Sequence, residues 1–164
     1  MMDTEARRIV VGVDGSESSV AALRLAARLA PALEAQVHAV LCWNFPQIYA
    51  GYVPPDFAAF EGAAARRLSE VVTKAFGTEA APDVTTKLVR GPAAEKLVEE
   101  GSTAQMIVVG RRGHGGFRGL HLGSVSSACV LHAECPVVVV HEEVTHESHR
   151  RKERKARGEH SAQH

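Results

Sequence analysis

The sequence has no excess of charge of either sign, because its 164 residues include 19 Lys and Arg against 19 Asp and Glu. A surface field of the kind that attracts nucleic acid or an acidic membrane is therefore not expected. No apolar run is long enough to span a bilayer. The short apolar run near the N-terminus ends at Asp14 without the small-residue cleavage pattern of a secretory signal. These absences predict a soluble cytoplasmic protein without nucleic-acid or membrane partners.

Cysteine is scarce and histidine is scattered. Cys42, Cys129 and Cys135 form no CxxC pair, and the nine histidines show no HExxH-type spacing. The pattern indicates neither a zinc site nor a redox couple. The thiols are expected to be reduced packing residues, and no metal ligands are predicted.

What is present is an alternation of β-branched runs and helical periods, which predicts an α/β fold with a parallel sheet covered on both faces. Ser16 is the predicted N-cap of the first helix, and Leu25, Leu29 and Leu33 are expected on its apolar face. The predicted strands are residues 7–13, 36–43, 84–91, 106–110 and 136–141, and the predicted helices are 17–33, 60–75, 93–101 and 124–133.

Three segments stand outside this pattern. Residues 1–6 are an N-terminal extension to a domain at 7–141. Residues 142–164 contain one valine and no larger apolar residue, which predicts a disordered charged tail. The basic run at 150–157 is interpreted as a solvated part of that tail. Residues 44–57 hold three prolines and several aromatics, and form either a functional lid or a loop packed on the sheet edge.

A glycine-rich and arginine-rich stretch, GRRGHGGFRGLHLGS, joins the strand that ends at Gly110 to the helix that begins at Ser124. In parallel α/β sheets, ligands bind beyond the carboxyl ends of the strands. Glycine lets backbone N–H groups approach an anion, and a helix N-terminus adds open N–H groups, so the stretch predicts a phosphate site. An empty scaffold loop is the alternative. The loop residues predicted to serve the site are Arg111, Arg112, Gly115 and Gly116.

The spacing of this stretch excludes two common phosphate loops and indicates a third. There is no Walker A lysine and no GxGxxG. Gly110, Gly113, Gly123 and Ser124 instead follow G-2x-G-9x-G-[ST], which resembles the ATP-binding signature of the universal stress protein family. The opening IVVGVDGSESSVAALRLAARLA and the closing CPVVVV also resemble that family, over about residues 7–141.

The resemblance implies a Rossmann-like, open five-stranded parallel sheet in the order 3-2-1-4-5, with helices on both faces. It implies ATP as the ligand, with Mg²⁺ as a candidate counter-ion. It also implies a homodimer through the last strand, residues 137–140. An apolar edge strand needs a cover, and the alternative to a dimer is an edge masked by the C-terminal tail.

The family's nucleoside positions correspond to residues at the ends of the first two strands. The resemblance places Asp14 near the adenosine, with Gly12 and Val13 beside it, and Leu41 and Cys42 at the adenine. A carboxylate at a strand end accepts hydrogen bonds from hydroxyl or amino groups and repels phosphate, so Asp14 suits the nucleoside end. The alternative is a turn aspartate.

The family's phosphate positions correspond to the glycine series. The resemblance implies that Gly110 and Gly113 wrap the ribose and phosphates. It implies that Gly123, Ser124 and Val125 hold phosphates at the start of the helix.

No catalytic constellation is evident. There is no GxSxG elbow, and the loop contains no carboxylate to hold a metal for phosphoryl transfer. His114 and His121 are interpreted as exposed loop residues. We expect an ATP-binding regulator of the stress response that acts as a dimer and hydrolyses ATP slowly at most. The alternatives are a nucleotide-independent dimeric scaffold, or a slow ATPase that accepts phosphate on Ser124 or Ser126.

Overall fold

The computed structural model describes residues 7–45, 56–78, 83–111 and 122–142. Strands and helices alternate along the described chain, and each predicted element is present. The strands are β1 (Arg8–Gly12), β2 (Gln36–Trp43), β3 (Val84–Arg90), β4 (Met106–Gly110) and β5 (Val137–Val140). The helices are α1 (Glu17–Leu33), α2 (Phe57–Phe76), α3 (Ala93–Gly101) and α4 (Ser124–His132).

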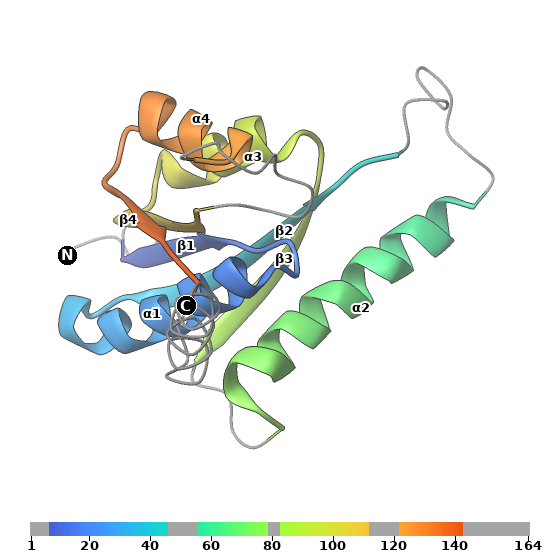
Figure 1. Ribbon diagram of the computed structural model, residues 1–164, viewed down its shortest axis with the longest axis horizontal. Coiled ribbons are helices and arrows are strands. Elements are labelled where there is room, and N and C mark those ends of the chain that lie inside the picture. The colour runs from blue at the N-terminus through green and yellow to red at the C-terminus, as the bar shows by residue number, and fades with distance from the viewer. Residues whose placement is uncertain (1–6, 46–55, 79–82, 112–121, 143–164) are drawn as a thin grey trace, which may run out of the picture.

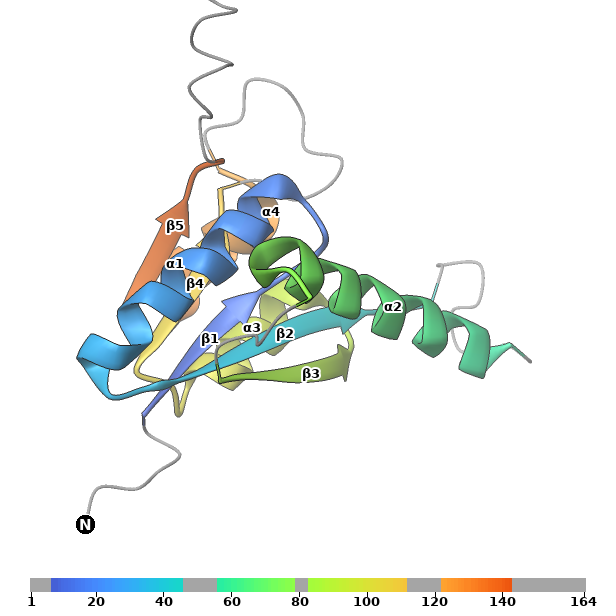
Figure 2. The same cartoon turned by 90° about the horizontal axis from the view of Figure 1, so that it is seen from below.

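The strands form one parallel sheet in the order β3-β2-β1-β4-β5, which confirms the predicted fold class. Helices α1 and α2 cover one face, and α3 and α4 cover the other (Figure 1; Figure 2). The chain moves from β1 outward to β3, then returns to the centre and moves to β5 on the other side. The crevice between the carboxyl ends of β1 and β4 is therefore the point where strand order reverses.

The core lies in two layers, one on each face of the sheet. Ile9 and Val11 of β1 pack with Leu23 toward α1 and α2, whereas Val10 packs with Leu97 toward α3 and α4. All five side chains are at most 3% exposed. Burial on both faces explains why these strands are continuous apolar runs and do not alternate with polar residues.

The buried side of α1 differs from the predicted one. Ser19 N–H donates to Ser16 Oγ at 3.2 Å, which confirms Ser16 as the N-cap. Leu23 is fully buried, however, whereas Leu25, Leu29 and Leu33 are only partly buried. The prediction placed the buried face of the helix at its leucines of four-residue spacing, because these are large apolar side chains. Alanines such as Ala22 and Ala26, both fully buried, let the helix approach the sheet closely and so set its orientation.

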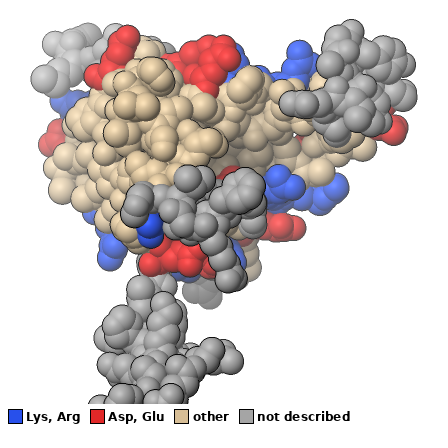
Figure 3. Space-filling view, turned by 45° about the horizontal axis from the view of Figure 1, so that its top comes forward, with Lys and Arg blue, Asp and Glu red and all other residues tan. Residues whose placement is uncertain are grey.

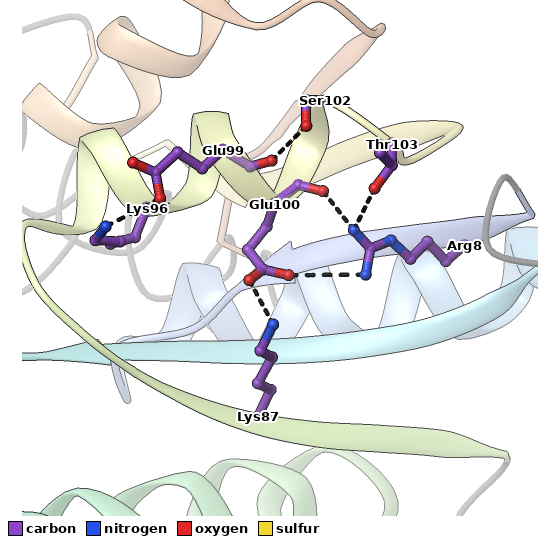
Figure 4. Close-up of polar contacts among 7 residues, drawn as sticks. All are labelled: Arg8, Lys87, Lys96, Glu99, Glu100, Ser102 and Thr103. Atoms are coloured by element: carbon purple, nitrogen blue, oxygen red, sulfur yellow. Dashed lines mark hydrogen bonds and ion pairs between the residues drawn. The ribbon is translucent and has the colours of Figure 1, made fainter.

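A polar cluster joins the end of α3 to the sheet on the α3 side (Figure 4). Arg8 Nη2 donates to the backbone oxygen of Glu100 at 2.9 Å and to Thr103 Oγ1 at 2.6 Å. The Glu100 carboxylate accepts from Lys87 Nζ at 2.6 Å and lies 3.7 Å from Arg8 Nη1. Arg8 begins β1, so this cluster lies toward the amino end of the sheet, away from the strand ends that form the crevice.

His38 of β2 makes stability depend on pH. Burial and the positive charge of Arg8 lower its pKa from the ordinary value of 6.5, and Lys87 adds to this while Glu100 opposes it. The folded protein thus disfavours the protonated form, and the unfolded chain binds more protons as the pH falls through 6.5 toward the lowered pKa. Stability that is present above pH 6.5 should be lost over this interval.

We expect the urea midpoint of the wild type to fall between pH 7.5 and 5.5, and the fall to be smaller in His38→Asn. Replacement of His132, exposed on α4, by Asn is the matched control. Equal falls in the wild type and His38→Asn would show that His38 does not carry the effect.

Candidate functional site

Two strands and two helix N-termini meet at the crevice. β1 ends at Gly12 and β4 ends at Gly110, and the two strands are paired up to Gly12 and Val109. Helix α1 follows β1 through a four-residue turn, and α4 follows β4 after the glycine loop. The arrangement brings open backbone groups and one carboxylate to the same edge of the sheet.

Asp14 takes part in the turn between β1 and α1. Ser16 N–H donates to Asp14 Oδ1 at 2.9 Å, and Asp14 N–H donates to Ser19 Oγ at 3.4 Å. Gly15 has φ +91°, which a residue with a Cβ adopts at a cost. The side chain of Val13 is buried, and its N–H bonds to Val40 O at 2.9 Å. The turn interpretation of Asp14 is therefore observed, and its role toward a nucleoside stays a prediction.

The glycines at the two strand ends are required by packing. A Cβ on Gly12 would lie 2.6 Å from Leu97 Cδ1 of α3. A Cβ on Gly110 would lie 2.4 Å from Ser18 Oγ and 2.8 Å from the Ser18 carbonyl carbon. The sequence analysis predicted only a ligand-binding role for both glycines. The structure adds a second role, because each lets a helix lie directly against a strand end.

Helix α4 begins at Ser124, as predicted, and is preceded by a glycine cap. Gly123 is the N-cap and makes no side-chain cap, whereas Ser124 is the first helical residue and is exposed. Gly123 N–H donates to Arg111 O at 2.8 Å, so this amide is already engaged. The amides of Ser124 and Val125 belong to the first turn and have no acceptor within the helix. The first hydrogen bond of the helix runs from Ser127 N–H to Gly123 O, so Ser126 N–H lacks a helical acceptor as well, and within the described residues these amides are available to an anion.

Ser126 is buried behind these amides. Its side chain is 2% exposed, and its Oγ donates to Arg111 O at 3.0 Å and lies 3.2 Å from Gly123 O. A buried, engaged hydroxyl is a poor phosphate acceptor. The alternative of a phosphorylated serine is therefore better suited to Ser124 than to Ser126.

The two predicted adenine positions lie on opposite faces of β2. Leu41 is 1% exposed, packs toward α1 and α2, and pairs with Leu88 of β3 two residues before β2 ends. Cys42 packs toward α3 and α4, and burial raises the pKa of its thiol to about 11. The thiol is thus protonated at neutral pH and is no nucleophile.

An aromatic cluster lies beside this position, in agreement with the interpretation of residues 44–57 as a loop packed on the sheet edge. Trp43 and Phe45 follow Cys42, and their rings lie 5.5 Å from each other and from Phe57 at the start of α2. Phe60 lies 5.5 Å from Phe45, and the Arg90 guanidinium lies 5.7 Å from the centre of the Phe45 ring. The described ends of the 44–57 segment therefore pack on the sheet edge. Residues 46–55 lie outside the described parts, so the lid interpretation is not tested.

Several predicted site residues are also outside the described parts of the chain. They are Arg112, Gly113, Gly115 and Gly116. Within the described ranges, no group of three His, Cys, Asp or Glu side chains is placed to hold a metal ion. None of the helices in those ranges is long and apolar enough to cross a membrane.

Comparison with known proteins shows the family. The model of the universal stress protein family matches residues 5–141, and the chain belongs to that family. Universal stress protein Rv1996 of Mycobacterium tuberculosis is 33% identical over 139 residues, which are 80% of this chain and 43% of that protein. The chain thus spans less than half the length of this curated relative.

Solved structures of the family share the fold. A universal stress protein in complex with cAMP is 27% identical, with a TM-score of 0.53, and the match covers 84% of this chain and 98% of that one. The universal stress protein from Archaeoglobus fulgidus in complex with dAMP is 25% identical, with a TM-score of 0.56 and coverage of 81% and 96%. Adenine nucleotides are therefore bound by two similar proteins.

Proposed function

We propose that this chain is an ATP-binding regulator of the stress response. The observation that carries the proposal is the open N-terminus of α4 at the crevice where strand order reverses. Ser16 caps α1 with its own side chain, whereas the N-cap of α4 is a glycine, so among the described residues no side chain caps the amides of Ser124 and Val125. The cAMP and dAMP complexes of similar proteins support an adenine nucleotide as that ligand.

The site suits a ligand with an anionic end and a neutral end. The phosphates would lie on the amides of Ser124 and Val125, with Mg²⁺ as a counter-ion from solvent. Asp14 lies at the end of β1, where its negative charge favours the nucleoside end over phosphate. The base would lie beside Leu41 and Cys42. The proposed role of the nucleotide is that of a regulatory ligand, hydrolysed slowly at most.

The dimer through β5 is part of the proposal. β5 is an edge strand of four half-buried valines, and an apolar edge strand needs a partner or a cover. On α4, Val130 is 50% exposed and Leu131 is 76% exposed. The face that carries α3 and α4 has a broad area without Lys, Arg, Asp or Glu (Figure 3). We define β5, Val130 and Leu131 as the β5–α4 surface, and propose that a second copy covers it in the cytoplasm.

The β5–α4 surface also supports a second function, that of a dimeric scaffold that binds no nucleotide. Native mass spectrometry of the full chain, as purified and after addition of ATP or cAMP, separates the two. We expect a dimer that carries one ATP per chain. In a separate phosphate-release assay, we expect at most slow hydrolysis of ATP. A dimer that ignores every adenine nucleotide would contradict the ATP proposal and support the scaffold.

A further inference from the structure

Arg111 connects the start of the glycine loop to both parts of the β5–α4 surface. Its N–H donates to Val140 O at 2.7 Å and so continues the pairing of β4 with the last residue of β5. Its carbonyl oxygen accepts from Gly123 N–H at 2.8 Å and from Ser126 Oγ at 3.0 Å, both at the start of α4. One residue therefore bonds to both β5 and α4 at the mouth of the proposed site.

The first turn of α4 contains both the amides proposed to bind the ligand and the groups that bond to Arg111. Ser124 and Val125, whose amides would hold phosphate, lie between Gly123 and Ser126, which bond to Arg111. A phosphate on these amides would restrict the first turn of α4, and with it the Arg111 carbonyl and the end of β5. Leu131, on the last turn of the same nine-residue helix, would be restricted too. Ordering a surface in advance lowers the entropy cost of covering it.

We propose, on the basis of the proposed ATP and dimer functions, that ATP binding strengthens self-association through Arg111 and Ser126. The coupling is reciprocal: ATP lowers the Kd of the dimer by the same factor by which dimerisation lowers the Kd for ATP. The regulated output of the site is then the population of dimer, which rises with ATP.

The test measures two constants separately on the full chain. Sedimentation velocity over a dilution series gives the dimer Kd with and without saturating ATP and Mg²⁺, and calorimetry gives ATP binding. We expect ATP to tighten the wild-type dimer by at least about fivefold, the lower end of typical coupling. In Ser126→Ala this factor should fall toward one. Ser127→Ala, which removes a neighbouring hydroxyl that makes no hydrogen bond to the described residues, should keep this factor.

The outcomes are distinct. ATP binding together with an unchanged dimer Kd would overturn the coupling and leave the proposed function standing. Full coupling in Ser126→Ala would overturn the role of the Ser126 hydroxyl in that coupling. Absence of ATP binding in the calorimeter would overturn the proposed function itself, and the coupling with it. Circular dichroism shows whether Ser126→Ala folds. If it does not fold, the dimer Kd of the wild type with and without ATP still tests the coupling.

Discussion

Replacement of Gly123 by valine is expected to weaken ATP binding by at least about 100-fold while the fold persists. Gly123 has φ −71° and ψ 165°, which a β-branched residue adopts without strain. The new side chain would stand at the cap of α4, between the phosphates and the amides of Ser124 and Val125. Loss of two hydrogen bonds to a charged group, each worth about 1.5–3 kcal/mol, corresponds to that factor or more.

Calorimetric titration with ATP, beside a thermal melt of each variant, measures this effect. Gly123→Ala carries a smaller side chain at the same backbone angles and should lose less affinity than Gly123→Val. Because glycine itself provides no side-chain cap, either change should cost no more than about 1 kcal/mol of stability. Tight ATP binding by a folded Gly123→Val protein would show that the start of α4 does not bind ATP.

Replacement of Gly110 by alanine is expected to lower the free energy of unfolding by about 1–3 kcal/mol, the usual cost of overpacking. The added Cβ would lie 2.8 Å from the backbone carbon of Ser18, which is 1% exposed. Relief requires the first turn of α1 to move away from the end of β4. Asp14 is tied to that turn through Ser16 and Ser19, so ATP binding should weaken as well.

Urea unfolding of Gly110→Ala and Gly62→Ala compares one chemical change in two settings. Gly62 lies in α2, where the nearest atom to an added Cβ is Arg66 Nη1 at 3.7 Å. Alanine there should stabilise the protein by about 0.5–1 kcal/mol through its helix propensity. The two variants should therefore shift the midpoint in opposite directions. Wild-type stability of Gly110→Ala would show that α1 does not restrict this position.

Both glycines belong to one sequence motif, yet they differ in physical role. Gly110 is required because a helix lies against it, whereas Gly123 has backbone angles that any residue adopts and contributes by placing no side chain at the start of α4. Spacing along the chain does not separate these roles. A motif match therefore does not by itself say what each of its residues does in the fold.

The sequence by itself determined the element order and the region of the candidate site. Continuous Val and Ile runs separated by helical periods allow little besides a parallel sheet covered on both faces. The N-cap at Ser16 was readable because capping is a local hydrogen bond between residues three apart. The strand order followed from the resemblance to the family.

Only the tertiary structure decided which side chains are buried and which backbone groups are free. Leu23 replaces Leu25 at the centre of the buried side of α1, because contact with the sheet sets the rotation of the helix. The aromatic cluster with Arg90 joins the ends of β2, β3 and α2, and the Arg111 contacts join β4, β5 and α4. Such contacts connect segments far apart along the chain, and local patterns of propensity and spacing contain no information about them.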